Sequence, residues 1–227
     1  MSKEADVLYA DYSKKSFRDL SPNHTPYLIL GTPFFCRETE WEGEDYSMVL
    51  PTGSAIGYLF NNDVYDQYSN AFSVEFLMYY SQEQTRIPNI ILGHKDTGGF
   101  CFYEMGVAER YGGLIFSVNT YFNYLKAQSL RRDCLYLRGS WHHIAGVFDG
   151  RTVYLYINGE QVANSMGDGA ICGEICQPAP PNQLFCIGGT VFDGKFQEET
   201  DCNIRIKYIK IYSTARSPEE IWQDSHL

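Results

Sequence analysis

The sequence is poor in charged residues, and positive charge is the scarcer kind. Charged residues make up 20% of the chain, and 18 lysines and arginines stand against 28 aspartates and glutamates, a formal net charge of −10. A field of that sign repels phosphate backbones and anionic lipid surfaces. We therefore expect no nucleic acid and no anionic membrane surface as a partner. A neutral or cationic ligand, or a bound divalent cation, fits the charge better.

Long apolar runs are also missing. No stretch approaches the roughly 20 residues that a membrane-spanning helix needs, so we expect no membrane insertion. The opening residues, MSKEAD, do not have the pattern of a signal peptide. The expected location is extracellular or cell-surface if Met1 is not the natural start, and cytoplasmic if it is. Seven cysteines are an odd number, which leaves at least one thiol unpaired in any compartment, so their count does not decide between the two.

Familiar catalytic motifs are absent as well. The chain has no Gly-x-Ser-x-Gly, no His-Glu-x-x-His and no phosphate-cradling glycine-rich loop before a helix. His142 and His143 are neighbours on an expected strand, so they face opposite sides and cannot share one metal. We expect His143 to be a buried, hydrogen-bonded structural residue. We expect this chain alone to be no enzyme.

What the sequence does contain is a repeated β-pattern. The stretch from Trp141 to Asn164 holds two hairpin-turn dipeptides, Asp149-Gly150 and Asn158-Gly159, between β-branched and aromatic runs. Three consecutive antiparallel strands are therefore expected. On the middle strand Tyr154 and Tyr156 share the face opposite the core, where they are either solvated or line a groove.

Similar strand and turn patterns run along the rest of the chain. Hydrophobic residues make up 44% of it, enough for a core. The first strand is expected to pair with the last, and residues 46–50 are expected to pair with 55–60 around Pro51-Thr-Gly53. Ser217-Pro-Glu-Glu220 predicts a short capped helix at the end. No linker divides the sequence, so we expect residues 1–227 to form one all-β domain, a two-sheet antiparallel sandwich with a short C-terminal helix.

Residues 72–80 form an almost continuously apolar strand, which implies that both of its faces are covered. Glu75 and Tyr79 lie on the face that alternates away from Phe72 and Phe76. A carboxylate on a covered face must be paired, hydrogen-bonded or exposed to a wet groove. Glu75 therefore has either a structural partner or a role toward a ligand.

Two groups of loop residues are candidates for binding. The segment 61–70 offers oxygen ligands for calcium, or is simply a solvated polar turn; the ligand candidates are Asn61, Asn62, Asp63 and Asp66. Aromatic rings can contact the apolar faces of sugars. The tyrosines in or near loops are Tyr65, Tyr68, Tyr111, Tyr121 and Tyr124.

Five segments carry a family resemblance. In order, they are Phe72-Ser-Val-Glu-Phe, Trp141-His-His-Ile-Ala-Gly-Val-Phe-Asp-Gly, Val153-Tyr-Leu-Tyr-Ile-Asn-Gly-Glu, Leu184-Phe-Cys-Ile-Gly-Gly and Ile211-Tyr-Ser-Thr-Ala-Arg-Ser-Pro-Glu-Glu-Ile. Together they resemble the LamG-like jelly-roll domains of the concanavalin A-like lectin/glucanase superfamily, to which laminin G and pentraxin domains are related. The likeness extends over nearly the whole chain.

The resemblance implies two antiparallel sheets, one of them concave, with a ligand site on the concave face or its rim. Relatives bind carbohydrate or protein, some of them through calcium, and many are accessory domains of secreted or surface enzymes. The last strand of relatives usually carries an acidic residue where this chain has Lys207 and Tyr208, which argues against a calcium site there. The Glu-x-Asp-x-x-Glu run of the family's retaining glucanases, which brings two carboxylates about 5 Å apart, is not present.

Three functions remain in view. The first is a non-catalytic module that binds a glycan, with or without calcium, through Glu75, Tyr79, Tyr154, Tyr156 and the loop tyrosines. The second is a protein-interaction or structural accessory domain of a larger hydrolase, such as a glycosidase or phosphoesterase. The third is a stand-alone glycan hydrolase or lyase, which predicts two carboxylates converging in one groove.

Overall fold

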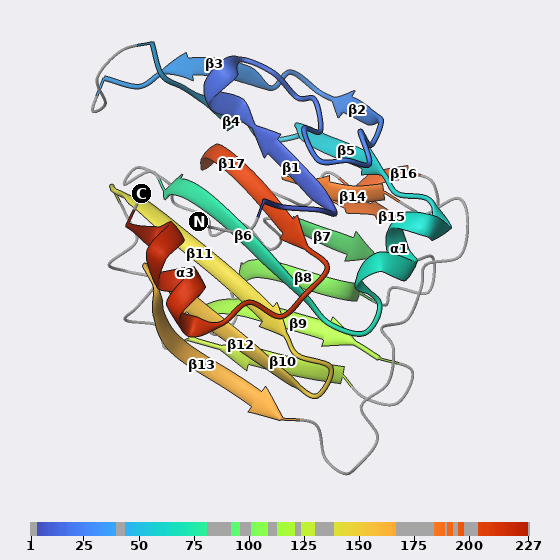
Figure 1. Ribbon diagram of the computed structural model, residues 1–227. Helices are drawn as coiled ribbons and strands as arrows, with labels where there is room; N and C mark the ends of the chain where they lie inside the picture. Colours follow the sequence, from blue (N-terminus) through green and yellow to red (C-terminus); the bar gives the residue numbers. More distant parts are fainter. Residues whose placement is uncertain are drawn as a thin grey trace.

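Two antiparallel sheets face each other across an apolar core in the computed structural model of the chain (Figure 1). The structure describes residues 4–39, 44–80, 92–95, 101–108, 113–120, 124–129, 139–166, 184–188, 190–192, 195–197 and 204–226. The expected all-β sandwich with a short C-terminal helix is confirmed. Within these ranges no helix is both long and apolar enough to cross a membrane.

Sheet A runs in the order β13-β12-β11-β6-β17-β4-β3, and β1 also pairs with β17. Its strands are β1 (Leu8–Asp11), β3 (Phe34–Arg37), β4 (Tyr46–Leu50), β6 (Phe72–Tyr80), β11 (Trp141–Phe148), β12 (Thr152–Ile157), β13 (Glu160–Met166) and β17 (Ile204–Tyr212). The predicted pairing of the first strand with the last is thereby confirmed.

Sheet B runs in the order β10-β9-β8-β7-β14-β5-β2. Its strands are β2 (Tyr27–Leu30), β5 (Ala55–Leu59), β7 (Leu92–Lys95), β8 (Cys101–Ala108), β9 (Gly113–Asn119), β10 (Tyr124–Gln128) and β14 (Leu184–Ile187). A separate two-stranded ribbon joins β15 (Thr190–Phe192) to β16 (Lys195–Gln197). The helices within the described ranges are the 3-10 turn η1 (Tyr12–Lys14), α1 (Asn62–Tyr68) and α3 (Pro218–Ser225).

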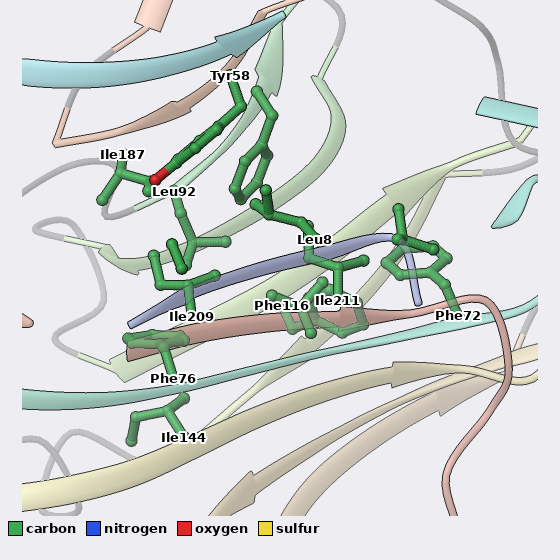
Figure 2. Packing of buried hydrophobic residues seen from close by; sticks show 14 of the residues in the cluster. Leu8, Tyr58, Phe72, Phe76, Leu92, Phe116, Ile144, Ile187, Ile209 and Ile211 are labelled. Atoms are coloured by element: carbon green, nitrogen blue, oxygen red, sulfur yellow. The ribbon is translucent and has the colours of Figure 1, made fainter. Parts of the chain in front are cut away.

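The core lies between the two sheets. Figure 2 shows side chains of sheet A, such as Phe76 and Ile209, packing toward side chains of sheet B, such as Leu92 and Phe116. All four are fully buried. Burying a side chain of this size stabilises the fold by about 1.5–3 kcal/mol. Strand β6 runs through the middle of sheet A and is covered on both faces at its Phe72 end, whereas Leu77 and Tyr79 are only half-buried, so the predicted covering of both faces holds for part of the strand.

The two hairpins predicted in the 141–164 stretch are confirmed. Strand β12 pairs with β11 on one side and with β13 on the other, antiparallel in both cases. The turns place Gly150 at φ +91°, Asn158 at +51° and Gly159 at +82°. Glycine and asparagine tolerate this left-handed region better than other residues, which is why these dipeptides define the turns.

The predicted pairing of residues 46–50 with 55–60 is wrong. Strand β4 pairs with β3 and β17 in sheet A, whereas β5 pairs with β2 and β14 in sheet B. The turn between them, closed by a hydrogen bond from Ser54 N to Pro51 O (3.0 Å), carries the chain from one layer to the other. Apolar residues of both strands thus face the same core from opposite sides, for example Met48 and Ile56.

The C-terminal helix α3 lies over the β11–β12 side of sheet A (Figure 1). Its predicted capping box is present: Glu220 N–H donates to Ser217 Oγ (3.3 Å), and Ser217 N–H donates to Glu220 Oε2 (2.8 Å). Ile221 is fully buried and packs on Ala145, Val147 and Tyr156. The helix therefore covers part of the sheet face that points away from the core.

Candidate ligand-binding face of sheet A

The outward face of sheet A has a covered part and an open part. Because side chains alternate along a strand, β6 directs Ser73, Glu75, Leu77 and Tyr79 away from the core. The first two are fully buried, whereas Leu77 and Tyr79 are only half-buried. The change comes about halfway along the strand, so the two parts have different roles.

The covered part is a buried cluster of charged groups. Glu75 Oε2 lies 3.0 Å from His143 Nε2, and Glu75 Oε1 lies 3.3 Å from Arg216 Nε. The guanidinium of Arg216 also donates from Nη1 to Asp224 Oδ2 (3.0 Å). His143 is thus the buried, hydrogen-bonded histidine that the sequence predicts. Glu75 has the structural partners that were one of its two alternatives, and it is fully buried, so this structure does not present it to a ligand; the ligand role stays a prediction.

The same cluster controls protonation around it. Burial lowers the pKa of the Arg216 guanidinium, but its acidic neighbours, first among them the Glu75 carboxylate, together outweigh burial and raise the pKa overall. Burial, and next the charge of Glu75, raises the pKa of Tyr208 and of Tyr212 well above the usual value. Arg216 therefore stays charged, and the phenols of Tyr208 and Tyr212 stay neutral, around neutral pH.

The open part presents a row of aromatic and cationic side chains across three strands. Trp141 on β11 lies directly opposite Tyr79 on β6, and Tyr79 lies directly opposite Arg205 on β17. The ring centroids of Tyr79 and Trp141 are 5.7 Å apart, and the guanidinium carbon of Arg205 lies 4.4 Å from the Tyr79 centroid. With the half-buried Leu77 and Tyr208 beside them, these residues form what we call the aromatic face.

A β-bulge in β17 makes this arrangement. The pairing register with β6 shifts between Ile206 and Tyr208. Arg205 and Tyr208 are three residues apart and would otherwise point to opposite sides, but the extra residue, Lys207, lets both point outward. Ile206 and Ile209 meanwhile both stay fully buried in the core.

The cations near the aromatic face are paired with carboxylates. Arg205 Nη1 donates to both oxygens of Glu38, at 3.2 and 3.0 Å. The hydroxyl of Ser47 donates to the same carboxylate, which is only 4% exposed. Further along β17, Lys207 pairs with Asp45 and the Lys210 amine lies 3.5 Å from Asp224 Oδ2. The aromatic face thus contains cationic groups but little unbalanced charge.

Two of the predicted loop tyrosines belong to the core. The predicted polar loop is in fact helix α1, which begins where the Asn61 side chain accepts a hydrogen bond from Val64 N (2.9 Å). Helical spacing turns Tyr65 and Tyr68 to the same side, where both are almost completely buried. Their rings lie 5.8 and 6.1 Å from the ring of Phe60. Both rings therefore pack in the core, and the prediction that they contact a ligand stays a prediction.

The tyrosines of β12 are tied to α3. Tyr156 is 3% exposed because Ile221 covers it, so this structure does not present it to a ligand, and its ligand role stays a prediction. Tyr154 is half-buried against the same cluster and donates to Asp149 Oδ2 (3.1 Å) at the hairpin turn. It therefore does not join Tyr79 in the aromatic face. Of the predicted ligand residues whose side chains the structure describes, Tyr79 is the one that does.

Three predicted ligand residues are not decided by the structure. Tyr111 and Tyr121 lie outside the described residues. Tyr124 begins β10, opposite Asn119 of β9, but its side chain also lies outside the described part. All three stay predictions.

The predicted calcium ligands stand on helix α1. Asn61 uses its side-chain oxygen to cap the helix, and Asp63 and Asp66 are exposed on its first turns. Calcium takes six to eight oxygens, which a short helix does not wrap around an ion. Across the described ranges no group of three or more His, Cys, Asp or Glu side chains could hold a metal. Calcium binding stays a prediction.

Two facing antiparallel sheets with an aromatic row on one outward face define a lectin-like β-sandwich. A family model described as "Concanavalin A-like lectin/glucanases superfamily" matches residues 52–222, most of the chain. The chain belongs to this superfamily, which confirms the resemblance drawn from the five segments.

Among curated proteins, Pappalysin-1 of Mus musculus is 32% identical over 90 residues, which are 39% of this chain and 5% of the relative. The match therefore spans a small fraction of that protein's length, and its activity does not transfer to this chain.

Solved structures share the fold. The receptor binding domain of botulinum neurotoxin C/D mosaic serotype superposes with a TM-score of 0.71 at 16% identity, covering 98% of this chain and 51% of that one. Domain 4 of AbnA, a GH43 extracellular arabinanase from Geobacillus stearothermophilus solved in complex with arabinotriose, gives 0.63 at 18% identity and covers 97% and 98%. This chain thus spans about half of the toxin domain and nearly all of the arabinanase domain. At these identities the likeness is one of fold.

Proposed function

We propose that this chain is a non-catalytic recognition module whose aromatic face binds a glycan. The observation that carries the proposal is the row of Trp141, Tyr79 and Arg205 on the open part of sheet A. Aromatic rings pack against the apolar faces of sugar rings, while guanidinium N–H groups donate to sugar hydroxyls. Among the hydrogen bonds of the described residues, Arg205 uses only Nη1, so it retains donors for a ligand.

The domain of the arabinanase supports the proposal. It has the same fold over nearly its whole length, and it was solved with a trisaccharide bound. This shows that a sandwich of this size can bind a sugar without a further domain. The identity of 18% carries no site residue from that protein to this one.

The state of the carboxylates supports a non-catalytic role. A glycosidase needs two carboxyl groups about 5–10 Å apart on either side of the scissile bond, one of them able to give up a proton. Glu75 is fully buried between His143 and Arg216, and Glu38 is fixed by Arg205 and Ser47. Neither carboxylate is available for acid or base chemistry on the aromatic face.

Affinity gel electrophoresis and a glycan array test the proposal, with arabino-oligosaccharides as the first probes. Tyr79→Ala and Trp141→Ala should each weaken binding about tenfold, equivalent to roughly 1.4 kcal/mol. Trp222→Ala is the matched control, since this tryptophan on α3 is 54% exposed and lies outside the aromatic face. An array on which the folded chain retains no glycan would refute the function, as would binding unaffected by the two aromatic variants.

Calcium assistance is a separate part of the proposal, and a chelator decides it. If calcium takes part, EDTA should abolish binding and added Ca²⁺ should restore it, while Asp63→Asn with Asp66→Asn should shift the calcium requirement. Binding that EDTA leaves unchanged would show that the glycan is held without a metal.

A second candidate function is that of a protein-interaction or accessory domain in a larger hydrolase. The observation that favours it is the exposure of Leu28 (51%) and Ile29 (47%) on β2, Phe34 (51%) on β3 and Leu59 (46%) on β5. Strands β2 and β3 are edge strands and β5 lies beside β2, and exposed apolar residues at such positions are a common feature of protein contacts. Charged replacements at Leu28 and Ile29 should then release a partner domain without affecting glycan binding. A native polypeptide in which this domain accompanies a hydrolase would favour this function.

A further inference from the structure

The charge balance at the aromatic face bears on which glycans it takes. The face belongs to a chain with a net charge of −10, and each of the three cations on β17 is paired with a carboxylate. We infer, resting on the glycan-binding function proposed above, that the face selects neutral glycans over anionic ones. Glu38 is the residue that sets this preference, because it balances the guanidinium that lies over Tyr79.

The first step of the argument is that Arg205 is not free to bind an anion. Its Nη1 group forms hydrogen bonds to both oxygens of Glu38. A sugar carboxylate or sulfate that approached the guanidinium would meet the charge of Glu38 behind it. Like charges at such short range repel, and the repulsion is stronger where water is excluded.

The second step is that Glu38 cannot move aside. It is only 4% exposed, and the hydroxyl of the fully buried Ser47 donates to it from the neighbouring strand. Its backbone N–H also bonds to the carbonyl of Asp45 (2.9 Å). An anionic ligand that formed an ion pair with Arg205 in place of Glu38 would leave the buried Glu38 carboxylate without its cation, which is strongly unfavourable.

The third step is that a neutral sugar needs no such exchange. It can lay its C–H face on Tyr79 and Trp141 and accept hydrogen bonds through hydroxyl oxygens from the remaining N–H groups of Arg205. The ion pair stays intact and helps, because it holds the guanidinium 4.4 Å above the Tyr79 ring before a ligand arrives. Preorganisation of this kind lowers the entropic cost of binding. Glu38 thus acts as a positioning residue that also cancels charge.

The long-range field acts in the same direction. A net negative protein slows the approach of an anionic oligosaccharide, and the effect weakens as salt rises. Binding of a neutral sugar should be insensitive to salt, because no ions are released or screened. Salt dependence therefore separates the two kinds of binding.

The experiment measures dissociation constants by isothermal titration calorimetry for neutral arabino-oligosaccharides and for oligogalacturonides of matched length, at about 20 and 200 mM NaCl. We expect the wild-type chain to bind the neutral series at least tenfold more tightly, with no effect of salt. Glu38→Gln keeps the size of the side chain and removes its charge. This variant should lower the preference for neutral over acidic oligosaccharides at least tenfold, and it should make the binding of the acidic ones salt-dependent.

Two further variants keep the test sharp. Glu160→Gln removes the same charge at an exposed position on β13, away from the aromatic face, and should leave the preference unchanged. Adding Arg205→Gln to Glu38→Gln should abolish the gain in affinity for acidic oligosaccharides. That result would show that the gain comes from the freed guanidinium. Circular dichroism and urea unfolding confirm that each variant is folded.

The outcomes separate the inference from the function beneath it. If the wild-type chain binds acidic and neutral sugars equally, or a folded Glu38→Gln chain gains nothing for acidic ones, the inference fails and glycan binding stands. If no glycan of either charge binds, the proposed function fails and the inference with it.

Discussion

Replacing Arg216 with methionine should destabilise the fold more than most single changes. The side chain is 1% exposed, and it lies 3.3 Å from Glu75 Oε1 and 3.0 Å from Asp224 Oδ2, both on carboxylates that are themselves fully buried. Removing one partner of a buried ion pair typically costs about 3–5 kcal/mol, because the remaining charge keeps its desolvation penalty. Typical domains are stable by only about 5–15 kcal/mol. We therefore expect Arg216→Met to remove a large share of the stability.

The thermal shift follows from the size of the chain. At about 2–4 °C per kcal/mol for a domain of this length, the melting temperature should fall by roughly 6–20 °C. Urea unfolding followed by circular dichroism measures the same loss as a lower midpoint with an unchanged slope. Arg18→Met is the control, since Arg18 is exposed, and it should change the stability by no more than about 0.5 kcal/mol.

A rescue experiment shows whether the unpaired charges cause the loss. Combining Arg216→Met with Glu75→Gln and Asp224→Asn removes the buried charges together with their partner. Because no carboxylate is then left uncompensated, the triple variant should recover more than half of the lost stability. A loss below about 1 kcal/mol for Arg216→Met alone, with an unchanged slope, would refute the reasoning. In that case the cluster would not be what attaches α3 to sheet A.

Three smaller changes test other parts of the fold. Gly159→Ala should lower the free energy of unfolding clearly more than Gly53→Ala. Both glycines have positive φ, but a Cβ at Gly159 would lie 2.6 and 3.0 Å from atoms of α3, whereas a Cβ at Gly53 would meet nothing within 4 Å. Equal urea midpoints for the two variants would contradict this. Ser217→Ala should cost about 1 kcal/mol through loss of the helix cap, and Ser217→Asp should cost little. Burial raises the pKa of Tyr12 and of Tyr58 above the value near 10 that tyrosine has in the unfolded chain. The two neutral phenols therefore contribute their full stability to the fold below about pH 10, and this contribution is lost as pH rises through the folded pKa values. Urea midpoints between about pH 9 and 11 should fall less steeply for Tyr58→Phe than for the wild type, and parallel curves would contradict the assignment.

Local sequence patterns were enough to predict the two hairpins and the capped C-terminal helix. Asp149-Gly150 and Asn158-Gly159 define turns because few residues tolerate the positive φ that such turns need. Ser217 and Glu220 define a helix start because each satisfies the other's backbone N–H. These predictions depend on residues within a few positions of each other, so no knowledge of the rest of the fold was required.

The pairing of β4 with β5 could not be settled in the same way. Pro51 and Gly53 form a turn both in a hairpin and at a corner where the chain changes sheets. Which of the two occurs depends on the partners that the flanking strands find elsewhere, here β17 for β4 and β14 for β5. Both partners come more than 120 residues later in the chain.

Helix α1 was missed although its pattern is present in the sequence. Val64, Tyr65 and Tyr68 have the i, i+1, i+4 spacing of a buried helical stripe, and Asn61 stands where a helix cap belongs. The same segment also has the oxygen ligands that suit calcium and the tyrosines that suit sugar, so its composition favours a binding loop as well. Spacing was the better guide, since it separates the side that packs on Phe60 from the side that faces solvent.

The aromatic face shows why a proposed binding surface is harder to predict than a fold. It takes Tyr79, Trp141 and Arg205 from three strands, and the carboxylate that balances Arg205 stands 167 positions away in the sequence. The bulge in β17 reverses the alternation that sequence reasoning relies on, so strict period two would place Tyr208 in the core. Glu38 alone has no recognisable motif.

The two acidic residues on the outward side of sheet A, Glu75 and Glu38, differ in what their charges do. Glu75 sits where α3 covers the sheet, so its charge is used to attach the helix through Arg216. Glu38 is buried as well, but its partner Arg205 is 35% exposed at the open part of the sheet, so in the proposal above its charge governs what that arginine binds. The difference lies in the cover over the arginine partner rather than in the residue type, and cover is a property of the whole topology. A carboxylate on a strand can therefore be assigned to structure or to recognition only after the element that packs over it is known.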